Sequence, residues 1–290
     1  MITINLYFIQ EEDNHEKIKS VFNFITILND RILLPIKKDE ILEKNQKVLK
    51  LINKTIKILK RKNIKTVVIS KKLQKNEQII NLLNSNNINI FDGRWLFKYI
   101  LYEIIDYILK KKNIKKEETE VSILTNELVE TTIENIKLFA KEFKRVNIVT
   151  NHIPSFRKIE EKLYNEYGIM ITVTNNKKKS LINSEIILNL DFSKETLNKY
   201  NINENAIIVN PEGNMKINKK RFNGTNVNDY EIEINRLEEI EFEKLQKFYL
   251  KEIYESEIYR KDNFLNIRKT IKKSGLKIKY LLGNNGILTL

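Results

Sequence analysis

The chain has 290 residues, of which 41% are hydrophobic and 31% charged, and its formal net charge is +14. This length and apolar content predict one large or two ordinary folded domains and exclude a disordered tail. The chain contains no cysteine, which excludes disulfides, thiolate zinc sites and a cysteine nucleophile. With only two histidines, His15 and His152, we expect no metal site.

The first residues and the hydropathy of the chain bear on its location. Residues 1–10 are apolar but lack the basic start and small-residue cleavage site of a signal peptide. No run reaches about 18 apolar residues without a charge, so no membrane span is expected. We therefore expect a soluble, cytoplasmic protein without a membrane partner.

The positive charge raises the question of nucleic-acid binding, because basic surfaces attract phosphate. However, the lysines are scattered among acidic residues, and the short basic runs 110–112, 177–179 and 219–221 are typical of solvated faces. No RNA-binding motif with stacking aromatics is present. Nucleic-acid binding is thus an alternative that rests on charge alone.

Strand-like and helix-like segments alternate through the first part of the chain. β-branched and apolar runs predict strands at residues 2–9, 66–70 and 88–91. Apolar residues at helical spacing predict helices at residues 14–28, 39–62, 76–83 and 95–111. This order predicts an N-terminal α/β domain over residues 1–112. The polar run KKKNIKKEET, residues 110–119, predicts the domain boundary.

Beyond this boundary the alternation becomes regular. Short runs of valine, isoleucine and leucine predict strands at residues 121–125, 146–150, 170–174, 185–190 and 206–210. Helices are predicted at residues 128–143 and 155–167. The pattern predicts a Rossmann-like, doubly wound parallel sheet in a domain of residues 120–236.

The pattern weakens after residue 211. Residues 215–222 and 230–234 alternate in part around Asn223-Gly224 and predict a hairpin or an added edge strand. Residues 237–260 predict one long amphipathic helix. Because its apolar stripe needs a neighbour, we expect the C-terminal segment 237–290 to pack back on the N-terminal domain.

The segment RVNIVTNHIPSFRKIEEKLYNEYG, residues 145–168, resembles the second strand and helix of the NADP-binding domain in shikimate dehydrogenases and glutamyl-tRNA reductases. NSEIILNL, residues 183–190, resembles their next strand, and NENAIIVN, residues 203–210, their closing strand. The resemblance covers about a third of the chain and implies a Rossmann-like fold.

A second similarity lies upstream. Asn89-Ile-Phe-Asp92-Gly93 stands where shikimate dehydrogenases place Asn-Thr-Asp-Gly, whose aspartate works with a lysine on the substrate. The lysine motif of that family is only weakly similar to residues 32–37, which end in Lys37. The resemblance thus implies Lys37 and Asp92 as catalytic candidates. The alternative is that Asp92 caps the helix that starts after Gly93.

The predicted phosphate loop departs from these families. Dinucleotide sites need G-x-G-x-x-G after the first strand, so that backbone amides reach the pyrophosphate. SILTNELVETTIEN, residues 122–135, contains no glycine and places Glu127, Glu130 and Glu134 at the helix start. We therefore expect no ordinary dinucleotide cofactor. The alternative cofactor is NADP, with Arg157 and Lys158 beside its 2′-phosphate.

Polar residues cluster where the predicted parallel strands end, which is where ligands bind in such sheets. The ligand-binding candidates are Thr125, Asn126, Asn151, His152, Thr174, Asn175, Asn189 and Asp191. Amides and hydroxyls of this kind suit a neutral or weakly charged ligand. The alternative is that asparagine favours strand ends and turns in any protein. His152 has no partner that the sequence assigns, so a catalytic role does not follow from it.

Together these patterns favour a Rossmann-like protein that binds a small ligand or a protein partner without ordinary dinucleotide catalysis. One alternative is an NADP-dependent oxidoreductase with a divergent phosphate loop. The other is a nucleic-acid-binding protein.

Overall fold

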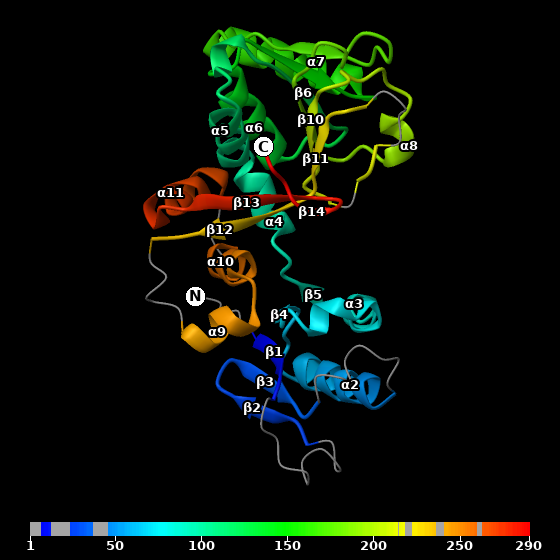
Figure 1. Cartoon of the computed structure of the whole chain (residues 1–290), viewed down its shortest axis with the longest axis vertical. Helices are drawn as coiled ribbons and strands as arrows, with labels where there is room; N and C mark the ends of the chain where they lie inside the picture. The colour runs from blue at the N-terminus through cyan, green and yellow to red at the C-terminus, as the bar shows by residue number, and fades with distance from the viewer. Residues whose placement is uncertain are drawn as a thin grey trace. The chain divides into compact units, whose positions relative to one another are not determined.

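The structure is a computed structural model that describes residues 7–12, 24–36, 46–213, 215–217, 222–235, 241–259 and 263–290 (Figure 1). The chain forms two compact units. The first unit comprises Met1–Gly93 and Arg236–Arg260, and the second comprises Arg94–Asn235 and Lys261–Leu290. Each unit therefore combines segments that lie far apart in the sequence.

The first unit is built on a five-stranded mixed sheet of order β2-β3-β1-β4-β5. Its strands are β1 (Tyr7–Glu11), β2 (Thr26–Leu28), β3 (Arg31–Leu34), β4 (Thr66–Ile69) and β5 (Asn89–Ile90). The strands β3, β1, β4 and β5 run parallel, and β2 pairs antiparallel with β3.

Alternating side chains of this sheet enter two separate cores, as the two-residue period of a strand requires. Tyr7 and Ile9 of β1 join the core that includes residues of α2 (Gln46–Arg61) and α3 (Glu77–Ser85). Phe8 joins the opposite core with residues from α9 (Phe242–Lys247) to α10 (Leu250–Ile258). The first unit is thus a three-layer α/β/α structure.

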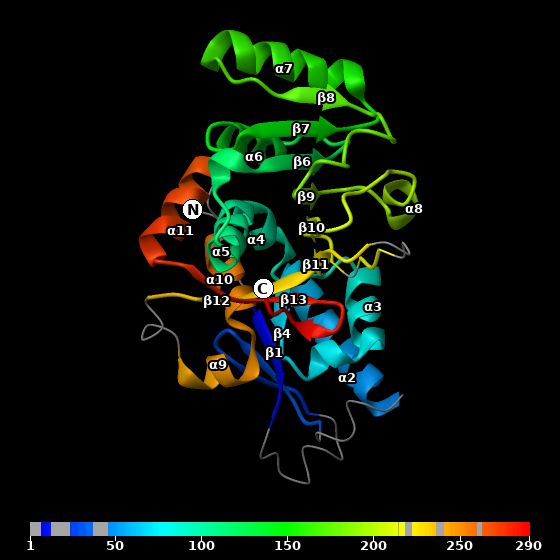
Figure 2. The ribbon, with the colours of Figure 1, turned by 45° about the horizontal axis from the view of Figure 1, so that its top comes forward.

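The second unit contains a six-stranded parallel sheet of order β11-β10-β9-β6-β7-β8 (Figure 2). Its strands are β6 (Glu120–Leu124), β7 (Arg145–Val149), β8 (Thr172–Thr174), β9 (Ile186–Asn189), β10 (Ile207–Val209) and β11 (Thr225–Val227). Counted in chain order within this sheet, the arrangement is 3-2-1-4-5-6, which is that of a Rossmann sheet. The predicted Rossmann-like parallel sheet is therefore confirmed.

Helices connect these strands as the βαβ pattern requires. They are α6 (Glu130–Ala140), α7 (Ile153–Tyr167) and the short α8 (Lys194–Leu197). Pro154 lies in the first turn of α7, where its missing amide is harmless, and Gly168 ends the helix at a φ of 65°. Leu197 and Tyr200 pack on Leu124 and Ile187 in the core of one sheet face.

Of the two alternatives predicted around Asn223-Gly224, the structure has an added edge strand and, among the residues it describes, no hairpin between these segments. β11 instead extends the parallel sheet, and β12 (Asp229–Glu233) pairs antiparallel with β13 (Lys277–Gly283). β13 in turn pairs with β14 (Gly286–Ile287). Periodicity identified the strand character of residues 230–234 but not a partner that lies near the end of the chain.

Two predicted long helices are each interrupted. Residues 95–111 form α4 (Arg94–Tyr99) and α5 (Leu101–Lys112), with Ile100 at the break. Between α9 and α10, Phe248 and Tyr249 are extended. Phe248 is fully buried, with its ring centroid 5.1 Å from that of Phe8. Burial of one aromatic ring therefore accompanies the break, which helical periodicity did not reveal.

The compact units do not follow the expected boundaries at residues 112 and 237. α4 and α5 belong to the second unit, where α4 contacts α6 and α5 contacts both α6 and β13. The buried Arg268 of α11 (Phe264–Ser274) contacts both helices. It donates to the Tyr99 carbonyl of α4 at 2.9 Å and pairs with Glu103 of α5. Of the C-terminal segment, only the part up to Arg260 belongs with the first unit.

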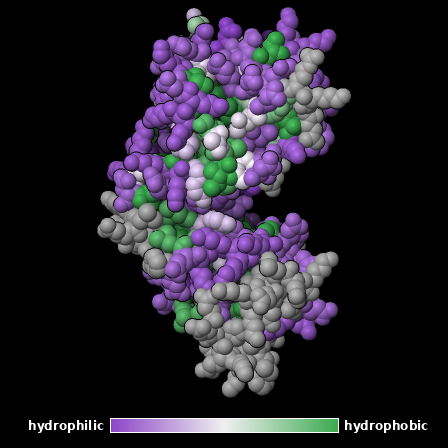
Figure 3. Space-filling view, in the orientation of Figure 1, coloured by the Kyte–Doolittle hydropathy of each residue, from purple (hydrophilic) through white to green (hydrophobic). Residues whose placement is uncertain are grey.

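The surface agrees with the lysine-rich composition. On the face shown in Figure 3, most described residues are hydrophilic and the hydrophobic ones gather in small patches. Among the described helices, none is long and apolar enough to cross a bilayer.

Phe139 of α6 provides a test of the packing in the second unit. Its side chain is fully buried against Tyr102 and Phe143. Phe139→Ala should therefore lower the free energy of unfolding of this unit by about 3–5 kcal/mol. Tyr164→Ala, at a side chain that is 60% exposed, should change it by less than about 0.5 kcal/mol. Urea denaturation followed by the fluorescence of Trp95 measures both, and equal losses would contradict this packing.

Candidate functional site

The carboxyl edge of the six-stranded sheet holds the first candidate site. In the Rossmann strand order, the direction of winding changes between β6 and β9, and ligands bind beside that point. Thr125, Asn126 and Glu127 follow β6, and Asp191 follows β9. The geometry around these residues therefore decides what the crevice can bind.

Asp191 fills the turn between β6 and α6. Its Oδ2 accepts hydrogen bonds from the backbone N–H groups of Asn126 at 2.7 Å and Glu127 at 3.0 Å. The same oxygen accepts from the Thr125 hydroxyl at 3.1 Å, and Oδ1 accepts from the Asn126 side-chain amide at 3.3 Å. The carboxylate thus engages the amides that a Rossmann site would offer to a pyrophosphate.

Asn126 extends this network to the next strand. Its Oδ1 accepts from the backbone N–H of Asn151 at 2.9 Å and from the Thr150 hydroxyl at 3.5 Å. Four predicted residues, namely Thr125, Asn126, Asn151 and Asp191, therefore meet across β9, β6 and β7. The sequence had not singled out Thr150, although it shares the Thr-Asn pattern of the strand ends.

The side chains of three more predicted site residues, His152, Thr174 and Asn175, lie outside this network, although the His152 backbone N–H donates to the Thr150 hydroxyl at 3.1 Å. His152 and Asn175 are exposed, and the His152 side chain makes no capping hydrogen bond at the start of α7. The Thr174 hydroxyl accepts from the backbone N–H of Asn176 at 3.1 Å, which is a local turn. These three residues fit the alternative in which polar residues serve strand ends and turns.

Asn189 belongs to a separate ladder of buried asparagines. Its Nδ2 donates to Oδ1 of Asn210 at 3.2 Å, and Nδ2 of Asn210 donates to Oδ1 of Asn228 at 3.1 Å. Asn228 in turn donates to the Met215 carbonyl at 3.1 Å. Because these amides satisfy one another across the ends of β9, β10 and β11, the ladder ties strands together rather than facing a ligand.

A cavity of about 50 Å³ lies beside Asp191. Its lining consists of Lys98, Leu101, Thr125, Glu127, Val129, Thr131, Thr132, Asn135, Leu190 and Asp191. Asn135 is only 2% exposed, and its Nδ2 donates to the Lys98 carbonyl at 2.9 Å. Its Oδ1 has no hydrogen-bond partner. The cavity can therefore take a hydrogen-bond donor the size of one or two water molecules.

The charges around this cavity are mainly acidic. Glu127 and Asp191 line it, and the lining Lys98 pairs with Glu212 at 2.5 Å. The space is far smaller than the several hundred Å³ of a typical ligand pocket, so only one group of a larger molecule would enter it. No cluster of three or more potential metal-binding His, Asp or Glu residues occurs among the described residues.

The predicted pair of Lys37 and Asp92 cannot be assembled from the structure, because Lys37 lies outside the described residues. Asp92 is exposed beyond β5. The backbone N–H of the next residue, Gly93, donates to Oε2 of Glu255 at 2.7 Å. Burial raises the pKa of the nearby Glu252 well above its ordinary value, Gln74 and Lys251 oppose this, and Glu255 and Asp92 add to it.

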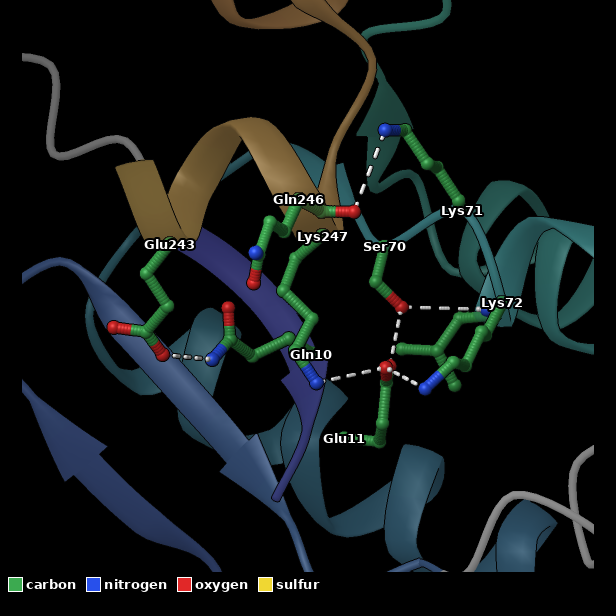
Figure 4. Close-up of polar contacts among 9 residues, drawn as sticks. Gln10, Glu11, Ser70, Lys71, Lys72, Glu243, Gln246 and Lys247 are labelled. Carbon is green, nitrogen blue, oxygen red and sulfur yellow. Dashed lines mark hydrogen bonds and ion pairs between the residues drawn. The ribbon is translucent and has the colours of Figure 1, made fainter. Parts of the chain in front are cut away.

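A second polar cluster occupies the carboxyl edge of the first unit (Figure 4). Glu11, at the end of β1, is buried, and its Oε2 accepts from the Ser70 hydroxyl at 2.7 Å. Its Oε1 pairs with Lys72 at 3.0 Å and with Lys247 at 3.1 Å. Burial alone would raise the pKa of Glu11, but hydrogen bonds from Ser70, its own backbone, Lys72 and Lys247 bring it below 4.5.

This cluster fastens α9 to the sheet. Lys247 lies at the end of α9, and its carbonyl accepts from the backbone N–H of Lys71 at 2.9 Å. On the same helix, Lys244 pairs with Asp30 at 2.8 Å, and Glu243 pairs with Arg31 at 2.6 Å. Sequence patterns did not reveal this cluster, although a glutamate two residues beyond the predicted strand 2–9 was a usable signal.

Comparison with known proteins gives similarity of architecture only. No protein-family model matches the chain, and no curated protein matches it. Among solved structures, an L-tryptophan dehydrogenase from Nostoc punctiforme is 6% identical, with a TM-score of 0.31 over 71% of this chain and 62% of the dehydrogenase. This chain therefore spans less than two thirds of that enzyme.

Two carbamoyltransferases are similar to the same degree. The anabolic ornithine carbamoyltransferase from Campylobacter jejuni is 9% identical, with a TM-score of 0.29 over 75% of this chain and 77% of the enzyme. The ornithine carbamoyltransferase from Thermus thermophilus is 8% identical, with a TM-score of 0.29 over 75% and 79%. At such values neither an activity nor a ligand follows for this chain.

Glu11→Gln should destabilise the first unit by about 1–3 kcal/mol at neutral pH, because it removes a charged acceptor from two lysines. The folded-state pKa of Glu11 is lowered, so its carboxylate stabilises the fold above the ordinary pKa of 4.5. That contribution is lost as the pH falls through the folded pKa. The difference between wild type and variant should therefore shrink on acidification.

Urea denaturation at several pH values, followed by circular dichroism, measures this difference. Glu77→Gln is the matched control, since Glu77 is exposed on α3 of the same unit. It should change stability by less than about 0.5 kcal/mol at any pH. A Glu11→Gln effect that persists undiminished in acid would contradict the role given to this carboxylate.

Proposed function

We propose that this protein is a Rossmann-like binding protein that takes a small polar ligand at the carboxyl edge of its six-stranded sheet and performs no ordinary dinucleotide chemistry. The observation that carries this proposal is the Asp191 carboxylate on the Asn126 and Glu127 amides. A bound pyrophosphate would have to displace a carboxylate that already makes these bonds. It would also meet Glu127 and Glu130 beside the start of α6.

The cavity beside Asp191 indicates the chemical class of the ligand. The unpartnered Oδ1 of Asn135 requires a donor, and the lining carboxylates of Glu127 and Asp191 favour an uncharged or cationic group. An amide, hydroxyl or ammonium group satisfies both conditions, whereas a phosphate satisfies neither. The rest of the ligand would lie over the strand ends, near Thr125, Asn126 and Asn151.

The resemblance to the NADP-binding domain of shikimate dehydrogenases and glutamyl-tRNA reductases belongs to the same proposal. The Rossmann strand order and the Thr-Asn end of β7 support a dinucleotide-binding domain whose phosphate loop has been replaced. Arg157 and Lys158 on α7 are exposed and would remain beside a 2′-phosphate position. In this proposal the Asp191 carboxylate takes the place of the pyrophosphate, and this is how the domain differs from a functional NADP site.

Asp191→Ala should expose the two amides of the β6–α6 turn. The variant should lose about 1–3 kcal/mol of stability, because the part-buried donors of Thr125 and Asn126 lose their acceptor. Inorganic phosphate should then raise the melting temperature of the variant more than that of the wild type, since a ligand that binds only the folded state stabilises it. Differential scanning fluorimetry over a phosphate titration measures this.

Glu195→Ala is the matched control for Asp191→Ala. Glu195 is exposed in α8 of the same unit, and its removal changes the net charge equally. The control should respond to phosphate as the wild type does. If phosphate raised the melting temperatures of all three proteins equally, Asp191 would not occupy an anion-binding site.

NADPH distinguishes the binding protein from an oxidoreductase with a divergent phosphate loop. Addition of NADPH to the wild type should leave both cofactor fluorescence and the protein melting temperature unchanged. Isothermal titration against amides, polyols and amines should instead find the ligand class. Tight NADPH binding, or turnover of the nicotinamide, would overturn the proposal.

A further inference from the structure

A groove of about 270 Å³ runs between α6 and α11, and it is separate from the strand-end site. The two helices contact each other within the second unit (Figure 2). One wall comes from Glu134, Lys137, Leu138 and Lys141, and the other from α11 between Phe264 and Lys272. Each wall extends over about two helical turns, or about 12 Å.

The groove has an apolar component. Phe264 is buried at its base, and Leu265 is 60% exposed. The inward face of α11 is formed by Phe264, Ile267 and Ile271, so Leu265 lies outside the stripe that packs on the unit. A single exposed leucine is ordinary on a protein surface, but here it lines a groove together with Leu138.

The charges of the groove are strongly biased. Five basic side chains and one acidic side chain line it. Lys137 is paired with Glu134 at 2.7 Å, and Arg268 is paired with Glu103. Lys141, Lys269 and Lys272 form no ion pair with any residue that the structure describes. These three lysines therefore add unpaired positive charge to a groove that Leu138, Phe264 and Leu265 also line.

We propose that this groove docks an acidic amphipathic helix of a partner protein. A helix that lies in a groove presents apolar side chains at positions i, i+3 or i+4, and i+7, which two turns of groove wall accommodate. Its acidic residues would face Lys141, Lys269 and Lys272. Complementary charge of this kind fixes orientation and accelerates association.

The lining argues against single-stranded nucleic acid as the occupant. Binding of unpaired bases depends on aromatic side chains on which the bases stack. The one aromatic residue of the groove, Phe264, is only 3% exposed. The aliphatic side chains of Leu138 and Leu265, which also line the groove, instead suit the apolar stripe of a helix.

Fluorescence anisotropy with a labelled model peptide tests the proposal on the full chain. The peptide has about 14 residues, with leucines at i, i+3 and i+7 and glutamates on its other face. We expect saturable binding that weakens as salt is added, because partly exposed charges are screened. A peptide of the same composition, scrambled to remove the helical period, should bind at least about tenfold more weakly.

Two double variants locate the binding. Lys269→Glu with Lys272→Glu should weaken binding of the model peptide about tenfold or more. Lys178→Glu with Lys199→Glu makes the same change of net charge at exposed positions outside the groove. This control should bind within about twofold of the wild type. Circular dichroism checks that both variants keep the fold.

Leu265→Asn separates the apolar contribution from charge, since it leaves every lysine in place. It should weaken peptide binding without changing its dependence on salt. The proposal is overturned if the scrambled peptide binds equally well or if the two double variants behave alike. It is also overturned if a single-stranded RNA displaces the peptide and loses affinity in the Lys269→Glu, Lys272→Glu variant.

Discussion

The hydrogen bonds of the Asp191 carboxylate join the ends of β9 and β6, and Asn126 extends this network to the end of β7. Backbone amides of the turn that leads from the first strand to the first helix need an acceptor, and in a dinucleotide site the ligand supplies it. Here a side chain that follows β9 supplies it, so the turn after β6 is satisfied without any ligand. Under the proposed function the turn needs no glycine, because no phosphate has to approach its backbone. The acidic start of α6 is tolerated for the same reason.

The first unit uses a related arrangement. Glu11 follows the apolar residues of β1 and accepts from Ser70 just beyond the neighbouring parallel strand β4. Asp191 follows β9 and accepts from Thr125 just beyond the neighbouring parallel strand β6. In both units a carboxylate and a hydroxyl therefore close the carboxyl edge between two adjacent strands. The partners differ, since Glu11 is neutralised by lysines whereas Asp191 is held chiefly by neutral donors.

The sequence predicted what depends on local patterning and missed what depends on distant partners. The β-branched runs located β6, β7 and β8, and the missing glycines indicated an altered phosphate loop. Asp191 was a candidate because it follows a strand, but its partners at Asn126 and Glu127 lie more than sixty residues away in the chain. The pairing of β12 with β13 and the break at Phe248 were missed because each depends on a contact with a distant segment.

The placement of α9 and α10 has a consequence for synthesis of the protein. One face of the first sheet, with Phe8, Val68 and Phe91, shares its core with Phe248 and Ile253. During translation these last two residues emerge only after nearly the whole second unit has been made. Until they emerge, this apolar face of the nascent N-terminal sheet lacks the residues that cover it. Exposed apolar surface is the condition under which nascent chains aggregate or recruit chaperones. A truncated product that ends before residue 242 would carry this liability permanently.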